Sequence, residues 1–537
     1  MAASDSALPA GAGAPPAPAP AAPPAAHPPL EGATRVIGTI VLATATFMNV
    51  LDTSIANVAI PTIAGDLGVS ANQGTWVITS FGVANAITVP ITGWLTQRIG
   101  AVKLFVASVL LFVLTSWLCG VAPNIGMLIF FRVLQGAVAG PMIPLSQTLL
   151  LSSFPKAKAG LALALWSMTT LVAPVIGPLL GGWITDNISW PWIFYINVPV
   201  GIVAAAGTWA IYRKRETPTR KLPIDSIGLA LLVLWVGCLQ VALDKGKELD
   251  WFESPLIVGL LLIAVVGLVV FLIWELTEKH PVVDLSLFTR RNFWTATVTL
   301  SVSFGLYFGN VVLLPLWLQQ YMGYTATMAG MALAPVGLAA VLLSPVVGLT
   351  IHRVDTRLYS TLALLVFALV FWMRSRYTTD IGMASIVIPT LIQGIAMAFF
   401  FIPLVSAALS GLPPERIPAA SGLSNFCRIL AGSFGTSIST TLWDNRMTLH
   451  HAQLVEHMTN ADPAALRTFE ALRGTGMTAE QGTAVVNRMI DTQAAMLGVN
   501  DVFWGSAVLF VAMIGLVWVA KPAKKGGAGG AEAAGAH

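Results

Sequence analysis

The sequence predicts an all-α membrane protein with fourteen transmembrane helices, arranged as two six-helix bundles with two further helices between them. Three observations predict this fold. Of the 537 residues, 56% are hydrophobic and only 10% are charged, whereas soluble domains carry about a quarter charged residues. Uncharged runs of about 20 residues, long enough to cross the hydrocarbon core, recur along the chain. Short motifs of the first half also return in the second half.

The predicted spans are fourteen apolar runs. They cover residues 36–60, 75–96, 104–121, 125–150, 160–183, 192–211, 225–243, 255–274, 294–318, 328–350, 358–373, 383–410, 418–442 and 502–520. They contain many Gly and Pro residues, which membrane helices tolerate because neighbouring helices and water satisfy the freed backbone groups.

These spans divide the chain into five parts. Residues 35–215 form the N-terminal bundle, 225–274 the inserted pair, and 290–520 the C-terminal bundle, which includes a long polar loop over 443–501. Residues 1–34, rich in Pro and Ala, and residues 521–537, rich in Lys, Gly and Ala, are expected to be solvated tails.

Loop charges predict the orientation in the membrane. With a cytoplasmic N-terminus, nineteen of the 29 Lys and Arg residues fall on the cytoplasmic side. Eight fall outside, Arg374 among them, and two, Arg132 and Arg428, lie within spans. Cytoplasmic loops of membrane proteins carry an excess of Lys and Arg. We therefore expect a multi-pass membrane protein with both termini in the cytoplasm and the 443–501 loop outside.

An internal repeat supports two related halves. Three motifs recur in the same order, at offsets of 255, 258 and 262 residues. They are Pro90–Gly93 with Pro345–Gly348, Leu134–Gly136 with Ile392–Gly394, and Ala159–Leu161 with Ser421–Leu423. Parallel halves of this kind form transporters whose binding site lies at their interface, near the middle of the membrane.

The sequence offers no catalytic or cofactor motif. Cys119, Cys238 and Cys427 are scattered through apolar runs, and the histidines of the 443–501 loop have no cysteine or clear acidic partner, so no metal site is expected. No phosphate-binding loop or catalytic triad is present. An enzyme is therefore the least expected class of protein.

Ionisable residues inside the membrane are costly and usually functional. Only Asp52, Arg132 and Arg428 lie well within predicted spans. At 1.5 Å per residue, Asp52 and Arg132 both lie roughly 10–12 Å below the outer edge, so they can meet if their helices are neighbours. A role in transport and a structural ion pair between helices are the two interpretations of these charges.

Several motifs resemble those of the fourteen-helix drug:proton antiporters of the major facilitator superfamily. The resemblance runs from about residue 35 to the C-terminus. Its segments are Leu51–Pro61, Gly93–Gly100, Arg132–Gly136, Pro174–Gly182, Leu243–Trp251 and Ser410–Arg428. One departure is Gln97, which stands where the superfamily usually has Asp and which cannot form the salt bridge of that Asp.

The resemblance implies a proton-driven exporter without a bound cofactor. Asp52 would carry the proton, with Arg132 as its electrostatic partner. The motif residues of the fifth span are expected either to make a tight, kinked helix that seals the two halves against a proton leak or to serve ordinary membrane packing. They are Pro174, Gly177, Pro178, Gly181 and Gly182.

The intramembrane charges also predict the substrates. One acid against two arginines gives a positive interior, which favours neutral or weakly acidic hydrophobic compounds over cations. Arg428, with Asn425 near it, is the candidate contact for an anionic group. Gln135 is a further candidate substrate contact. Trp166 and Phe308 are candidates as well, because aromatic rings repack around varied ligands.

The resemblance also implies protein partners, namely a periplasmic adaptor and an outer-membrane channel. The 443–501 loop would help to dock the adaptor, or be a flexible excursion without that role. Two other functions remain open at this point. The chain could be an uncoupled facilitator or importer in which Asp52 is structural, or a membrane sensor built on a transporter fold.

Overall fold

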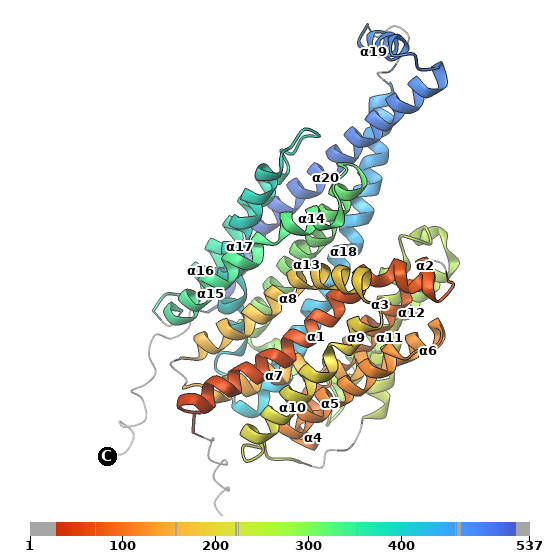
Figure 1. Ribbon diagram of the computed structural model, residues 1–537. Helices are drawn as coiled ribbons and strands as arrows, with labels where there is room; N and C mark the ends of the chain where they lie inside the picture. The colour runs from red at the N-terminus through yellow and green to blue at the C-terminus, as the bar shows by residue number, and fades with distance from the viewer. Residues whose placement is uncertain are drawn as a thin grey trace, which may run out of the picture.

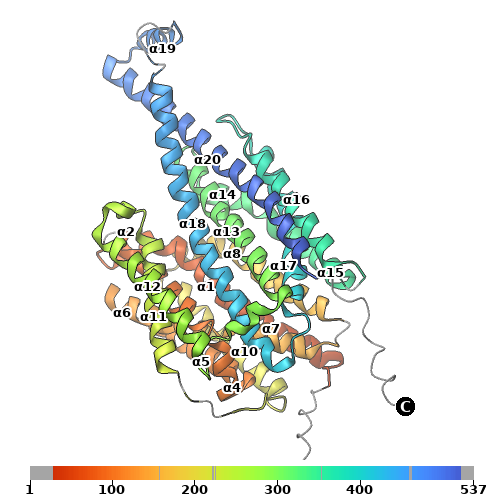
Figure 2. The same ribbon diagram turned by 180° about the vertical axis from the view of Figure 1, so that it is seen from behind.

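The computed structural model is all-helical over the residues it describes (Figure 1). These are residues 28–521, except 70, 156–157, 221–222, 224, 352, 457 and 459–462. Most of both predicted tails therefore lies outside the described residues. The first helix begins at Gly32 and the last ends at Val519, and both points lie at one end of the molecule, here named the termini end (Figures 1 and 2).

Over its described residues, the N-terminal bundle contains ten α-helical segments. They are α1 (Gly32–Asp66), α2 (Ala71–Gly74), α3 (Trp76–Thr88), α4 (Thr92–Ile99), α5 (Ala101–Gly120), α6 (Ile125–Ala139), α7 (Met142–Ser153), α8 (Ala159–Asn187), α9 (Trp192–Tyr195) and α10 (Asn197–Tyr212). The α3–α4 pair bends by 62° at its break, and α8 bends by 44° between Pro174 and Leu179. Both bends fall where proline removes a backbone donor from the helix.

Two helices follow the first bundle, and the first of them, α11, contacts both bundles. They are α11 (Ser226–Lys245) and α12 (Pro255–Thr277). The ammonium of Lys245 donates to Thr75 Oγ1 at 2.5 Å, just before α3, and Gln240 Nε2 donates to Ser433 Oγ at 2.8 Å in the C-terminal bundle. Lys245, expected in a loop, is thus buried at the end of a helix.

The C-terminal bundle repeats the architecture with longer helices. It contains α13 (Arg291–Gln320), α14 (Ala326–Leu333), α15 (Pro335–Thr350), α16 (Thr356–Arg374), α17 (Met383–Leu409), α18 (Ile417–Glu456), α19 (Pro463–Gly474) and α20 (Ala479–Val519).

Eleven helices of the described chain are long and apolar enough to cross a membrane, or thirteen when each bent pair counts as one span. They correspond to thirteen of the predicted spans. The remaining one, 418–442, forms the first part of α18, which does not pass this test. Polar residues such as Ser421, Asn425 and Arg428 lie along this part of α18 and are buried against other helices.

The 443–501 segment differs from the flexible polar loop expected from the sequence. α18 continues to Glu456 and α20 begins at Ala479, so the two form a helical hairpin that extends beyond the bundles, with α19 at its tip (Figure 1). His450 Nε2 lies 2.9 Å from Asp501 Oδ2, and His451 Nε2 lies 3.3 Å from Asp491 Oδ1. These histidines therefore have acidic partners, and the described residues contain no cluster of three or more metal-binding side chains.

Candidate functional site

Asp52 and Arg132 form an ion pair inside the N-terminal bundle, in agreement with the prediction that they can meet. Arg132 Nη1 on α6 lies 2.6 Å from Asp52 Oδ2 on α1, and the two side chains are 0% and 1% exposed. Arg132 Nε donates to the carbonyl oxygen of Val77 at 3.0 Å. The ring of Phe81 lies 4.2 Å from the guanidinium carbon and covers it.

Three uncharged side chains complete this cluster. Gln135 Oε1 accepts from Arg132 Nη1 at 2.7 Å, and its Nε2 donates to Asp52 Oδ1 at 3.3 Å and to Ser116 Oγ at 2.7 Å. Asn197 Nδ2 donates to Asp52 Oδ1 at 2.8 Å and to Ser116 Oγ at 2.9 Å. The cluster thus joins α1, α5, α6 and α10. Sequence reasoning missed Ser116 and Asn197, although Asn197 is a polar residue within an apolar span.

Both carboxylate oxygens of Asp52 have hydrogen-bond or ion-pair partners in this arrangement. Buried charges are tolerated when hydrogen bonds complete the ion pair. Arg132 Nη2 is the one nitrogen of the guanidinium left without a partner in the described structure. Gln135, proposed from the sequence as a substrate contact, is placed in this cluster instead of the central pocket.

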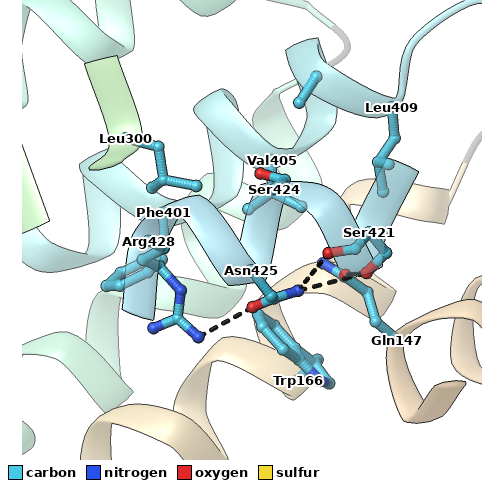
Figure 3. A pocket seen from close by; sticks show the side chains of 11 residues that line it. Gln147, Trp166, Leu300, Phe401, Val405, Leu409, Ser421, Ser424, Asn425 and Arg428 are labelled. Atoms are coloured by element: carbon cyan, nitrogen blue, oxygen red, sulfur yellow. Dashed lines mark hydrogen bonds between the residues drawn. The ribbon is translucent and has the colours of Figure 1, made fainter. Parts of the chain in front are cut away.

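Arg428 lies in a pocket between the two bundles (Figure 3). Its Nη2 donates to Asn425 Oδ1 at 2.9 Å, and its guanidinium carbon lies 4.8 Å from the centre of the Phe304 ring. The side chain is buried, and among the described residues no carboxylate forms an ion pair with it.

Both halves contribute to this pocket. Asn425 Nδ2 donates to the Ser421 carbonyl at 2.8 Å, and the Ser421 hydroxyl donates to Gln147 Oε1 on α7. Trp166, on α8, also lines the pocket, as expected (Figure 3). Phe308 does not line it; its ring stacks on Phe304, with the centroids 5.5 Å apart. Gln147 was not singled out from the sequence, although an amide within a membrane span was an available signal.

Close glycine contacts join the halves at the termini end. A Cβ on Gly160 of α8 would lie 2.5 Å from the carbonyl oxygen of Gly348 on α15, and a Cβ on Gly93 would lie 2.5 Å from Ala419 Cβ on α18. Gly93, Gly160 and Gly348 all belong to the repeated motifs. The repeat therefore supplies small residues where the two bundles meet.

The fifth-span motif brings α8 against α1. A Cβ on Gly177 would lie 2.4 Å from Ser54 Oγ, and the Ser54 hydroxyl donates to the Pro174 carbonyl at 3.2 Å. A Cβ on Gly181 would lie 3.1 Å from the Ile55 carbonyl oxygen, whereas the nearest atom to a Cβ on Gly182 would be 3.9 Å away. The side chain of Pro178 lies outside the described part of the chain.

Glu216 supplies a carboxylate to the start of α5, just after the Gly93–Gly100 motif. Its Oε1 and Oε2 accept from the backbone amides of Val102 and Lys103 at 2.9 and 3.0 Å, at the start of α5. A carboxylate there complements the positive end of the helix dipole. Gly100 has φ +99, and a Cβ on it would lie 2.5 Å from the Glu216 carboxylate. The start of α5 is thus stabilised by an acid from another segment of the chain.

Besides Lys245, one further charge was placed wrongly from the sequence. Arg374, assigned to an outer loop from the sequence, is the last residue of α16 and is 1% exposed. Its guanidinium donates to Asn310 Oδ1 at 3.0 Å and to Gln393 Oε1 at 2.8 Å. The hydrophobic run ended one residue before Arg374, so its charge was read as the start of the loop.

Comparisons with known proteins agree with this architecture. The model of the Major Facilitator Superfamily matches residues 42–436. The chain is 54% identical over 511 residues to the multidrug export protein EmrB of Escherichia coli (strain K12), covering 95% of this chain and 99% of EmrB. It is 48% identical over 504 residues to the fatty acid resistance protein FarB of Neisseria gonorrhoeae, covering 94% and 99% of the two chains.

Two solved structures share the fold. The human organic anion transporter MFSD10 has a TM-score of 0.58 at 12% identity, covering 91% of this chain and 100% of MFSD10. A bacterial homologue of the human lysosomal transporter Spinster has a TM-score of 0.51 at 14% identity, covering 91% and 97%. Together with the match of the family model, these similarities show that this multi-pass membrane chain belongs to the major facilitator superfamily, as the motifs predicted.

Proposed function

We propose that the chain is a proton-driven multidrug exporter in which Asp52 carries the coupling proton. The observation that carries this proposal is the Asp52–Arg132 pair, fully buried and 2.6 Å long. Among the described residues, Asp52 and Glu275 are the buried acids. Glu275 lies near the end of α12 and accepts from the Val283 amide at 3.1 Å, outside the two bundles' interiors. Asp52 is therefore the acid best placed for coupling.

The geometry suggests how a proton would be taken up and released. Burial penalises a charged carboxylate, and a neighbouring guanidinium stabilises it. In the present arrangement, Arg132 on α6 forms an ion pair with Asp52 on α1. A movement that separates them, during alternation between the two faces of the membrane, would favour the neutral acid. One proton would then enter from outside and leave to the cytoplasm as substrate moves outward.

The substrates we propose are hydrophobic compounds that are neutral or weakly acidic. Arg428 brings a positive charge to the pocket between the halves, with the uncharged Asn425 as its hydrogen-bond partner. A weak acid could pair with this guanidinium, and the rings of Phe304 and Phe401 beside it offer an apolar surface. Two relatives support this choice, because EmrB is named for multidrug export and FarB for resistance to fatty acids, which are hydrophobic weak acids.

We further propose an inner-membrane location, cytoplasmic termini and a tripartite assembly with a periplasmic adaptor and an outer-membrane channel. The α18–α20 hairpin lies opposite the termini end and carries α19 at its tip (Figure 2). It is the docking element we propose for the adaptor. Replacing residues 458–478 with a Gly/Ser linker should abolish recovery of the adaptor while leaving transport in vesicles intact. Unchanged adaptor recovery would exclude docking through this tip.

Transport by the purified protein in proteoliposomes tests the function. A pH gradient should drive accumulation of a lipophilic weak acid, with proton flux in the opposite direction, and an ionophore that collapses the gradient should stop it. If the substrate equilibrates across the membrane to the same extent with and without the pH gradient, the protein is a facilitator. Saturable binding without any transport would indicate a sensor.

A further inference from the structure

Arg374 is a buried charge without a counter-charge. Its Nη1 donates to Asn310 Oδ1 at 3.0 Å, and its Nη2 donates to Thr390 Oγ1 at 3.0 Å and to Gln393 Oε1 at 2.8 Å. All three acceptors are uncharged. Within the described chain, no carboxylate forms an ion pair with Arg374. Burying a charge is costly unless it is paired, so the missing partner requires an explanation.

The same positions in the N-terminal half hold the Asp52 cluster. Four residues of that cluster, numbered 52, 116, 132 and 135, correspond to residues 310, 374, 390 and 393 at one constant offset of 258. Asn310 thus replaces Asp52, Arg374 replaces Ser116, Thr390 replaces Arg132, and Gln393 matches Gln135. Each half therefore contains one buried guanidinium in this cluster, but the carboxylate is present only in the N-terminal half.

Several buried hydrogen-bond donors on or near Arg374 have no acceptor among the described residues. Arg374 Nε, Gln393 Nε2 and Trp317 Nε1 are buried and have no hydrogen-bond partner in the described structure, whereas the Tyr377 hydroxyl lies beside the Arg374 guanidinium. Tyr377 lies one turn beyond Arg374, its amide donating to the Arg374 carbonyl at 3.1 Å, and its ring stacks on Trp317 at 6.0 Å. Buried polar groups are normally hydrogen-bonded, and donors around a positive charge form the environment that an anion prefers.

We propose that Arg374, Asn310, Thr390 and Gln393 form a buried binding site for a small inorganic anion of the size of chloride. The anion would supply the negative charge that Asp52 supplies in the other half. These four side chains are at most 2% exposed, so the enclosure favours a monatomic ion over an organic acid. Water could accept hydrogen bonds from the same donors, but it would leave the charge of Arg374 unbalanced.

Thermal stability in different salts tests the site. The melting temperature of the purified protein in detergent would be measured in sodium chloride and in sodium gluconate, at fixed ionic strength and pH. Chloride and bromide should raise the melting temperature of the wild type by several degrees, with a saturable dependence on halide concentration. The exposed Arg376 is the matched control, and Arg376→Gln should keep the halide response.

Two variants separate the site from a general salt effect. Arg374→Gln should lose the halide response. Asn310→Asp places a carboxylate where Asn310 Oδ1 now accepts from Arg374 at 3.0 Å, so the variant should be at least as stable as the wild type in gluconate and should no longer respond to halide. Equal wild-type melting temperatures in chloride and gluconate would overturn the proposal. A halide response that persists in Asn310→Asp would overturn it as well.

Discussion

Arg132 on α6 and Asp52 on α1 form an ion pair of 2.6 Å that is sealed from solvent within the N-terminal bundle. The pair is coupled to α5 and α10, because Gln135 and Asn197 both donate to Asp52 and to Ser116. A change in the protonation of Asp52 would therefore act on four helices at once. This is the link we expect between proton movement and the rearrangement of the bundle.

The first prediction concerns Arg132. Arg132→Ala leaves a buried carboxylate without its cation and should lower stability by about 3–5 kcal/mol, with almost no proton-driven transport. Arg132→Lys keeps the charge and should retain partial activity. Thermal unfolding and vesicle transport measure both effects.

The control for Arg132 is Arg446→Ala, which removes an exposed pair with Asp501 at 3.7 Å. Exposed pairs contribute only about 0–1 kcal/mol, so this variant should melt close to the wild type. Wild-type stability and transport in Arg132→Ala would show that the buried pair is dispensable.

The second prediction concerns substrate charge. Arg428→Ala should reduce transport of weakly acidic substrates at least tenfold more than transport of neutral ones, because only the acids gain from the guanidinium. The comparison uses one acid and its neutral amide or ester in the same vesicles. Equal losses for both would argue against an anion contact, and preferred transport of permanently cationic dyes would contradict the positive pocket.

Most of the fold could be predicted from the sequence, because membrane spans are long and apolar and repeat motifs keep their order. The meeting of the Asp52 and Arg132 side chains agrees with the equal depth predicted for them in the membrane. Gln147 was missed, because which face of a helix meets the other bundle depends on packing that the order of residues does not specify.

Two errors have the same physical origin. Arg374 was assigned to a loop and residues 443–501 were read as flexible, because both assignments equated polarity with the end of a helix. Arg374 is instead held by neutral acceptors inside the bundle. α18 and α20 continue as paired helices beyond the apolar stretch. The offset of 258, which relates the four cluster positions of the two halves, was the available signal for Arg374.

The third prediction concerns the glycines at the termini end. Gly160→Ala places a Cβ 2.3 Å from Ile351 Cγ2 and 2.5 Å from the Gly348 carbonyl oxygen, so the halves must separate there. Transport should fall, and a cysteine introduced at Ser421 should react faster with a thiol reagent applied from the termini side. Gly182→Ala is the control, since its nearest atom lies 3.9 Å away. An unchanged labelling rate in Gly160→Ala would show that this contact does not hold the halves together.

The fourth prediction concerns orientation. In a cysteine-free background, Thr475→Cys beyond α19 should be labelled by a membrane-impermeant thiol reagent added to intact spheroplasts. Lys279→Cys, between α12 and α13, should be labelled only after the membrane is opened. The reverse pattern would invert the proposed topology.

Asp52→Asn tests the central claim most directly. The variant keeps the shape of the side chain but cannot carry a proton. We expect it to fold and to bind substrate, as measured by tryptophan fluorescence, and to exchange labelled for unlabelled substrate across the membrane without a gradient. In inverted vesicles with an imposed pH gradient, it should show no accumulation of a weakly acidic substrate. Accumulation at a rate near that of the wild type would contradict the assignment of Asp52 as the proton carrier.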